Sequence, residues 1–421
     1  MRTSILMLNE RFGERGEAEQ YLLHFSECFT DLGYQITLAY GRKTPADFSS
    51  PVIGEVCLPF LGEWWRPATP FELRALSEAA LAARPKLLIL HNLFDWRVLD
   101  ALAAALPGVP RVWFAHTQAL QWLEGVIVPQ TSRRTFTRWL FGQPVPAAPL
   151  NNRERAPIDG VSDPLEERRR FLGSLRHCDQ VVTANAETAA RLRGHLPSPF
   201  PPLAVVPYHS RPAALGREAT RVPLVLSTGP ITRRRGVAEL INAMALVQGV
   251  SERLLRIVGP AREPEYLDWC RTLARTLMDE EQALRIEFEL EPEAEMLEKA
   301  YAEATLVAVP TLWPESFQID VLEAMERGLP VVGFDVGRMD VVVRDGVTGL
   351  LVPPGDVGAL AATLERLLVD RDEARRMGGA ARLLAEWEFH ARDHVSALDR
   401  IFEQLLYPDP EAFLSDQAQS S

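Results

Sequence analysis

The chain has 421 residues, of which 47% are hydrophobic and 24% are charged, so it has the composition of a globular protein and the length for two hydrophobic cores. Its formal net charge of −12 argues against nucleic acid as the main partner, because phosphate backbones attract basic surfaces. The four cysteines lie far apart without paired spacing, which argues against a disulfide framework or a zinc site and indicates a reducing, cytoplasmic location.

The first half of the chain alternates between strand-like and helix-like patterns. The run "SILMLN" (residues 4 to 9) predicts a buried strand, and residues 17 to 33 predict a helix that ends at a glycine. Further strands are predicted over residues 34 to 40, 85 to 92 and 111 to 118, and a strand, turn and helix over 180 to 194. Only "ILML" precedes the first charged stretch, and no run has the length of a membrane span, so we expect neither a signal peptide nor a spanning segment.

A basic aromatic stretch, "SRRTFTRWLFGQ" (residues 132 to 143), carries Arg133, Arg134 and Arg138 among large apolar side chains. Two alternatives fit this composition. We favour a structural helix packed over the first domain. The other is an interfacial helix that makes peripheral contact with the cytoplasmic face of a membrane.

The second half continues the alternation. A proline-rich stretch from 197 to 212 predicts a linker, and strands at 223 to 229 and 254 to 259 flank a predicted helix at 236 to 247. Residues 305 to 334 predict strand, loop, helix and strand, a unit that builds parallel sheets. We therefore predict an α/β fold of two doubly wound, Rossmann-like domains facing each other across a ligand cleft.

Two carboxylates stand out in the stretch "TLWPESFQIDVLEAMERGLPVVGF" (residues 311 to 334). Glu315 precedes the predicted helix, for which Ser316 is the predicted N-cap, and Glu323 lies two turns inside it. Taken singly, Glu315 fits a partner of the helix dipole and Glu323 fits an exposed helix residue. Helix starts at the carboxyl ends of parallel strands are, however, where such sheets bind ligands.

The stretch resembles a signature of glycosyltransferase family 4, retaining nucleotide-sugar transferases of the GT-B fold. The resemblance rests on two glutamates separated by seven residues, a helix ending in glycine, a Pro-Val-Val strand, and "DGVTGLLVPPGD" (residues 345 to 356). It implies an N-terminal acceptor-binding domain over residues 1 to 210 and a donor-binding domain over 211 to 385. It also implies a C-terminal helix over 386 to 407 that returns to the first domain, before a disordered tail over 408 to 421.

In the first domain the resemblance points to the acceptor side of the site. The loop "GEAE" (residues 16 to 19) is similar to the family's Gly-Gly-x-Glu loop, with Gly16 kept and Glu17 in place of the second glycine. His116 matches the family's active-site histidine at the end of a strand. His91 and Asn92 end a neighbouring strand and are further candidates. Without the resemblance, a strand-end histidine fits a core or capping role as well.

In the second domain "STGPITRRRGVAEL" (residues 227 to 240) is similar to the family's phosphate-binding segment. Gly229 is kept, Pro230 replaces the first basic residue, and Arg235 stands where the family has lysine. We expect Arg234 and Arg235, within the run that begins at Arg233, to neutralise a diphosphate. The usual alternative for such a run is a solvated face.

The resemblance also implies the role of each glutamate. Glu315 would accept hydrogen bonds from hydroxyls of the donor sugar, and Glu323 would bind the ribose hydroxyls of the nucleotide. Backbone amides at the helix start would face the diphosphate, with the donor-binding residues Ser316, Phe317, Gln318 and Ile319 around them. We place Glu315, His116 and Arg235 in the catalytic group, with no general base, because the leaving phosphate is thought to take the acceptor's proton in this family.

The expected co-substrate is a nucleoside diphosphate sugar, the acceptor is a glycan, a lipid-linked sugar or a small molecule, and neither a cofactor nor a metal is expected. The chain departs from the family pattern at Pro230, Gln318 and Val341. These departures leave alternative functions open. The alternatives are a GT-B sugar-nucleotide epimerase or phosphorylase, and a catalytically silent sugar-binding relative. The sequence names neither the base, the sugar nor the acceptor.

Overall fold

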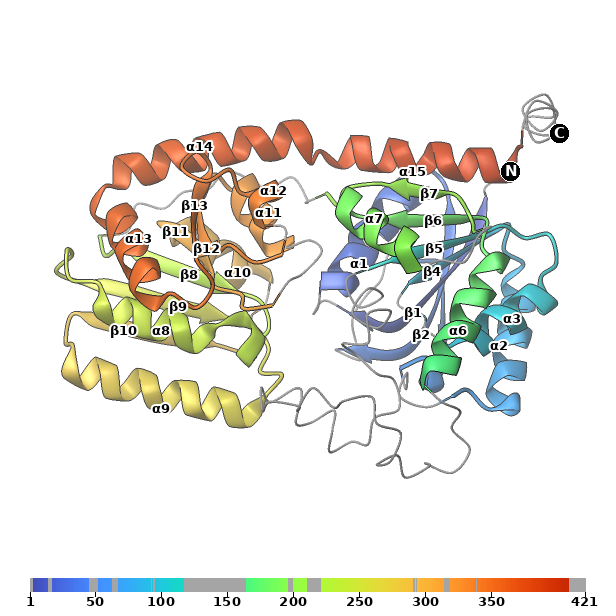
Figure 1. Ribbon diagram of the computed structural model, residues 1–421, viewed down its shortest axis with the longest axis horizontal. Helices are drawn as coiled ribbons and strands as arrows, with labels where there is room; N and C mark the ends of the chain where they lie inside the picture. Colours follow the sequence, from blue (N-terminus) through green and yellow to red (C-terminus); the bar gives the residue numbers. More distant parts are fainter. Residues whose placement is uncertain are drawn as a thin grey trace. The chain divides into compact units, whose positions relative to one another are not determined.

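The structure, a computed structural model, describes residues 3–13, 17–44, 52–62, 67–91, 93, 95–116, 164–195, 200–209, 221–290, 292, 294–313, 319–337 and 339–408. The chain divides into two compact units (Figure 1). The first comprises Ala18–Pro207, the strand that precedes it, and the chain from Arg392 onward, and the second contains Tyr208–Ala391.

The first unit is built on a parallel sheet. In the described part of this unit the sheet has the order β3-β2-β1-β4-β5-β6-β7, and every neighbouring pair is parallel. The strands are β1 (Ser4–Gly13), β2 (Gln35–Thr44), β3 (Gly54–Cys57), β4 (Leu87–His91), β5 (Arg111–Ala115), β6 (Gln180–Thr183) and β7 (Leu203–Val205). The strand order reverses between β1 and β4, the position where such sheets bind ligands beyond the carboxyl ends of their strands.

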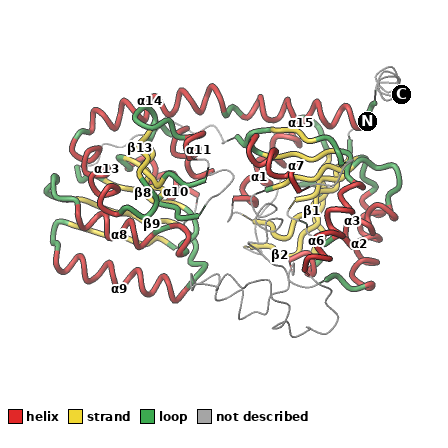
Figure 2. Tube along the Cα trace, in the orientation of Figure 1, coloured by secondary structure: helices red, strands yellow, loops and turns green. Residues whose placement is uncertain are grey.

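Helices cover both faces of this sheet (Figure 2). They are α1 (Glu17–Asp31), α2 (Pro70–Ala83), α3 (Trp96–Ala105), α6 (Pro164–Ser174), α7 (Ala186–His195) and α15 (Ala391–Leu406), with short 3₁₀ turns η1 (Pro59–Gly62) and η2 (Leu175–His177). Apolar residues of α2, α3 and α6 form one core cluster with the strands. On the other face Phe25 and Phe29 of α1 contact Phe402 of α15, with ring centroids 6.2 and 5.3 Å apart.

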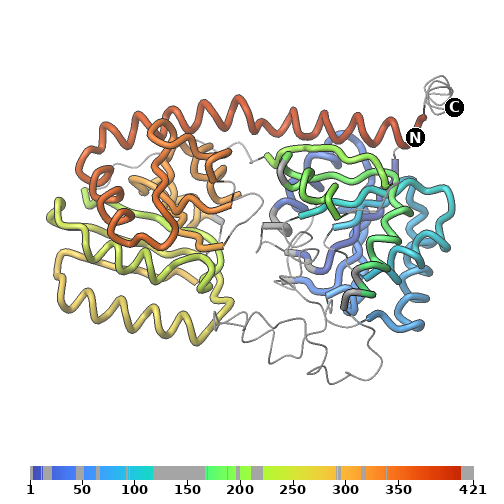
Figure 3. The backbone as a smooth tube through the Cα atoms, viewed as in Figure 1, coloured from blue at the N-terminus to red at the C-terminus, as the bar shows by residue number. Residues whose placement is uncertain are grey.

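The C-terminal helix therefore belongs to the first unit, and Figure 3 shows this end of the chain (red) beside the unit's blue and green segments. The single helix predicted over 386 to 407 needs correction. One helix, α14, ends at Glu388, and α15 begins only at Ala391. Phe389, between them, has φ −123° and ends the first helix.

The second unit has its own parallel sheet, with the order β10-β9-β8-β11-β12-β13 among the residues described there. Its strands are β8 (Leu224–Thr228), β9 (Arg253–Val258), β10 (Leu284–Glu289), β11 (Leu306–Val309), β12 (Val331–Phe334) and β13 (Gly349–Val352). Its helices are α8 (Val237–Leu246), α9 (Pro264–Glu280), α10 (Ala294–Glu303), α11 (Ile319–Glu326), α12 (Met339–Val342), α13 (Val357–Val369) and α14 (Arg371–Glu388), with a 3₁₀ turn η3 (Arg233–Arg235).

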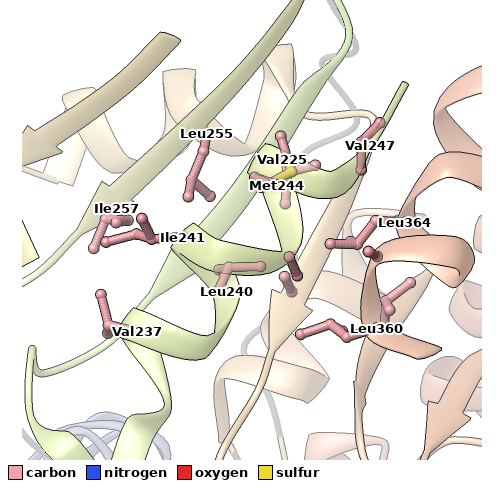
Figure 4. Packing of buried hydrophobic residues seen from close by; sticks show 14 of the residues in the cluster. Val225, Val237, Leu240, Ile241, Met244, Val247, Leu255, Ile257, Leu360 and Leu364 are labelled. Atoms are coloured by element: carbon pink, nitrogen blue, oxygen red, sulfur yellow. The ribbon is translucent and has the colours of Figure 1, made fainter. Parts of the chain in front are cut away.

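The core of the second unit shows why these segments fold as they do. Leu240 and Met244 of α8 pack toward Val225 of β8 and Leu364 of α13, and all four are fully buried (Figure 4). Strands β8 and β11 are buried along almost their whole length, because helices cover both faces of a parallel sheet. The predicted fold class, α/β with two doubly wound parallel sheets, is confirmed. No helix in the described ranges combines the length and apolar composition needed to cross a bilayer.

Candidate functional site

In the second unit the carboxyl end of β8 turns sharply at Gly229. Its φ is 101°, and an added Cβ would lie 2.7 Å from Nη2 of Arg235. A side chain here would therefore meet both backbone strain and the guanidinium. The glycine lets the chain pass close under Arg235, and the phosphate-binding role that the sequence suggested for this turn stays a prediction.

The three arginines that follow lie in the turn η3, and their side chains go to different partners. The Arg233 guanidinium lies over the ring of Tyr266, 5.2 Å from its centroid, and that of Arg234 lies 4.8 Å from the centroid of Trp313. Aromatic faces attract such cations. The expectation that Arg234 and Arg235 neutralise a diphosphate stays a prediction, and the contact of Arg235 with the helix of the two-glutamate motif gives it a place at that helix.

Arg235 links the β8 loop to the start of α11. Its Nη2 donates a hydrogen bond to the backbone oxygen of Thr228 at 3.2 Å and forms an ion pair with Oδ2 of Asp320. Both side chains of the pair are about one-eighth exposed, at 12% each. Asp320 lies in the first turn of α11. Sequence reasoning missed Asp320, because an acidic residue in a first helical turn is explained by the helix dipole alone.

Glu323 lies one turn further along α11 and is partly buried. Tyr301, at the end of α10, donates its hydroxyl proton to Oε2 of Glu323 at 3.1 Å. Since that hydroxyl has one proton, Thr228 Oγ1, 3.2 Å away, must donate to the tyrosine oxygen. Burial raises the pKa of Glu323, and Arg327 opposes this shift. Glu323 is therefore partly buried and fixed by the hydrogen bond from Tyr301. It is not the exposed helix residue that its position alone had suggested.

Several predicted residues lie outside the described residues. These are Glu315, Ser316, Phe317, Gln318, Gly16 and Asn92, together with the side chain of Glu17, whose backbone begins α1. Ile319 is the first residue of α11 and is buried. The predicted amide cradle and the role of Glu315 therefore stay predictions.

In the first unit two predicted histidines meet at the carboxyl edge of the sheet. His91 ends β4 and His116 directly follows β5. Their nitrogens Nδ1 and Nε2 lie 2.8 Å apart, and both residues are buried. Burial lowers the pKa of His91 well below its usual value and that of His116 to about 3. Both imidazoles are therefore neutral at pH 7.

Two residues that the sequence did not indicate complete this cluster. Tyr21 of α1 presents its ring edge to His116 and His394, with centroids 5.7 and 5.6 Å apart. His394 of α15 lies with Nδ1 2.6 Å from the Pro207 carbonyl oxygen and Nε2 3.1 Å from the Tyr21 hydroxyl. A carbonyl only accepts, so Nδ1 carries the proton and Nε2 accepts from Tyr21. No local motif could have found His394, which is 373 residues from Tyr21 in sequence.

The described residues contain no group of three or more His, Cys, Asp or Glu side chains that could hold a metal ion. The Asp-x-Asp at 370 to 372 lies at a helix junction, where Asp370 caps α14 by accepting from the amide of Glu373 at 2.8 Å.

Comparisons with known proteins match the chain in two adjacent stretches. The family described as Glycosyltransferase Family 4 matches residues 18–208, and the family described as Glycosyl transferases group 1 matches residues 216–384. A D-inositol 3-phosphate glycosyltransferase of Nocardia farcinica is 31% identical over 307 residues. That match covers 68% of this chain and 64% of the relative, so the chain spans less than two thirds of the relative's length.

Solved structures share the fold. Sucrose-phosphate synthase from Thermosynechococcus elongatus superposes with a TM-score of 0.71 at 20% identity, covering 97% of this chain and 100% of that one. Anabaena HepE in complex with UDP and glucose gives 0.67 at 19% identity, covering 96% and 99%. At these identities the likeness shows the fold alone, which is the two-domain GT-B fold. The two family matches together extend over both units, and the chain belongs to the group 1, family 4 glycosyltransferases.

Proposed function

We propose that the chain is a retaining hexosyltransferase that takes its sugar from a nucleoside diphosphate donor without a metal ion. One observation carries this proposal. The Arg235 guanidinium, held over Gly229 at the end of β8, meets the first turn of α11, the helix that carries Glu323. Arg235 thus pairs with Asp320, one helical turn before Glu323, at the carboxyl edge of a parallel sheet, where nucleotides bind.

Each group has a distinct task in this reaction. Arg235 would balance the charge that develops on the leaving diphosphate, and this stabilisation is strong because the guanidinium is largely shielded from water. Glu323 would accept hydrogen bonds from the ribose hydroxyls through Oε1, since Oε2 is engaged with Tyr301. Glu315 would hold the donor sugar from the loop before α11. The leaving phosphate would then take the acceptor's proton on the same face of the sugar.

The donor proposal agrees with what related proteins are named for. HepE was crystallised with UDP and glucose, so uridine nucleotides are the first donors to test. The Nocardia relative is named for D-inositol 3-phosphate, which makes a phosphorylated polyol the first small acceptor to test, beside glycans and lipid-linked sugars. Peripheral contact with membranes through residues 132 to 143, outside the described residues, stays a prediction. Replacing Arg133, Arg134 and Arg138 by Glu should reduce sedimentation with anionic vesicles.

A panel assay tests the proposal. The protein is incubated with uridine, guanosine and adenosine diphosphate sugars, with and without each acceptor, in the presence of a chelator. We expect release of one nucleoside diphosphate, a new glycoside with the donor's anomeric configuration, and rates that the chelator does not change. An epimerised donor as product would indicate an epimerase, and a sugar phosphate would indicate a phosphorylase. Either product would contradict the proposed transferase activity. Activity that vanishes with chelator and returns with magnesium would overturn the metal-free mechanism.

A further inference from the structure

The buried histidine pair of the first unit has a hydrogen-bond arrangement that the proposed function does not use. A neutral imidazole has one N–H and one bare nitrogen. Nδ1 of His91 and Nε2 of His116, 2.8 Å apart, must therefore share a single proton, donated by one ring and accepted by the other. Which ring donates decides which nitrogen of His116 carries its proton.

The surroundings of His91 distinguish the two arrangements. Its other nitrogen, Nε2, is buried and has no hydrogen-bond partner within the part of the chain that the structure describes. If His116 donated, His91 would have to carry its proton on that nitrogen, as a buried N–H without an acceptor. If His91 donates, the same nitrogen is a bare lone pair. Buried donors without partners are rarer than buried acceptors without partners.

We propose that His91 is a positioning residue that donates from Nδ1 to Nε2 of His116 and so fixes His116 as the Nδ1–H tautomer. His116 then has no bare ring nitrogen for removing a proton. Any substrate oxygen that approaches its Nδ1 must accept a hydrogen bond. His116 is therefore a neutral donor to a sugar or acceptor oxygen and not a general base, an assignment that rests on the proposed transferase function for its substrate.

The packing around the pair supports a fixed geometry. The ring of Phe114 lies 4.6 Å from that of His91, and the ring edge of Tyr21 faces both histidines at 5.9 and 5.7 Å. These contacts leave the rings little freedom to rotate. Burial lowers the pKa of both histidines, so a protonated pair with two donating rings does not compete near pH 7.

The tautomer can be measured in the full-length protein without substrate. The chain has eight histidines, and ¹⁵N-histidine labelling with two-bond ¹⁵N–¹H correlation separates the two tautomers of each. The His116 signals are assigned by their loss in His116→Gln. We expect His116 to carry its proton on Nδ1, and a signal pattern for the Nε2–H form would overturn the proposal. This result holds whether or not the protein proves to be a transferase.

Two variants test the consequence for turnover. His91→Asn keeps an N–H donor near the position of Nδ1, whereas His91→Leu removes the donor and keeps an apolar side chain. We expect His91→Leu to lower kcat about threefold to tenfold, the effect of one lost hydrogen bond, with little change in the donor KM, and His91→Asn to restore most of it. Both variants are compared by thermal melting. If His91→Leu folds and leaves both the His116 tautomer and kcat unchanged, His91 has no positioning role.

Discussion

The carboxyl edges of the two sheets differ in charge: the groups at the first are neutral and those at the second are ionised. In the first unit the groups at the edge are neutral: the buried imidazoles of His91 and His116 contact the ring of Tyr21, and His394 accepts a hydrogen bond from the Tyr21 hydroxyl. In the second unit the edge holds charges, the Arg235–Asp320 pair beside Glu323. The same type of parallel sheet, used twice, therefore ends in neutral hydrogen-bonding groups in one unit and in charged groups in the other, and under the proposed function the first would contact a sugar and the second a diphosphate.

The difference has a direct consequence for acid and salt. Neutral buried histidines are insensitive to ionic strength, but they resist protonation only while the unit stays folded. Charged partners respond to salt and to substitution of either partner. The two units should therefore respond differently to acid, salt and substitution.

Acid should destabilise the first unit and not the second. Burial lowers the pKa of His394 to about 4 and that of His116 to about 3, and it also lowers the pKa of His91 well below its usual value. The unfolded chain therefore binds more protons than the folded one below about pH 6.5. For each pH unit below that value, each histidine lowers the free energy of unfolding by up to about 1.4 kcal/mol, which amounts to about 4 kcal/mol per pH unit for all three. The stability that they supply is complete above that pH and is lost as pH falls.

The second unit should respond with the opposite sign. Burial raises the pKa of Glu323 and of Glu263, so the folded unit binds these protons more readily than the unfolded one and gains stability on acidification. Hydrogen exchange between pH 7 and 5.5, corrected for intrinsic rates, should show loss of protection in α1 and α15 but not in α8 and α11. Equal loss of protection in both units would contradict the opposite pH responses expected of them.

Asp320 tests the ionic edge from its acidic side. Replacing Asp320 by Asn keeps an oxygen that can accept from Arg235 but removes a negative charge near the proposed diphosphate. We expect the nucleoside diphosphate to bind more tightly, on the order of tenfold, and with a steeper dependence on salt. Asp372→Asn is the matched control, because it changes the net charge equally at a residue whose side chain is 87% exposed in α14. Weaker binding by Asp320→Asn would mean that the full ion pair is needed to hold Arg235.

Tyr301→Phe is a smaller perturbation of the same edge. It removes the hydroxyl that donates to Glu323 Oε2 and leaves the ring over which Arg327 lies, 4.4 Å from the centroid. Nucleoside and nucleoside diphosphate should each bind about threefold to tenfold more weakly, because the carboxylate loses a hydrogen bond that orients it but keeps its charge for the ribose. Tyr407→Phe removes a hydroxyl from an exposed tyrosine and is the control variant for these binding measurements. An effect confined to the diphosphate would contradict the assignment of Glu323 to the ribose.

Most of the fold could be predicted from sequence, because its strands are short and helices cover both faces of each sheet. Such strands appear as continuous apolar runs, as at Leu87–His91 and Leu306–Val309. The linker predicted over 197 to 212 is wrong at Leu203–Val205, which forms β7 and pairs with β6, and strand β3 (Gly54–Cys57) went unpredicted. It pairs at the edge of the sheet with alternating burial, and it carries a glycine and a glutamate in four residues.

The site was predictable only where residues share a local motif. Gly229, Arg235 and Glu323 were found because each lies in a segment with a recognisable pattern. Their partners come from far away in the sequence. Asp320 is 85 residues from Arg235, and Tyr301, in the preceding helix, is 22 residues from Glu323. Only the packing of α10 and α11 against the sheet brings them together, and no periodicity along the chain encodes that contact.

The central claim is that the edge of the second unit binds a nucleoside diphosphate, with Arg235 at the diphosphate and Glu323 at the ribose. Calorimetric titration of a nucleoside and its diphosphate against the wild type, Arg235→Ala and Glu323→Gln tests it most directly. We expect Arg235→Ala to weaken the diphosphate about tenfold to a hundredfold and the nucleoside hardly at all, and Glu323→Gln to weaken both ligands by a similar factor. If Arg235→Ala weakens both ligands equally, or Glu323→Gln leaves both intact, the account of this site is wrong.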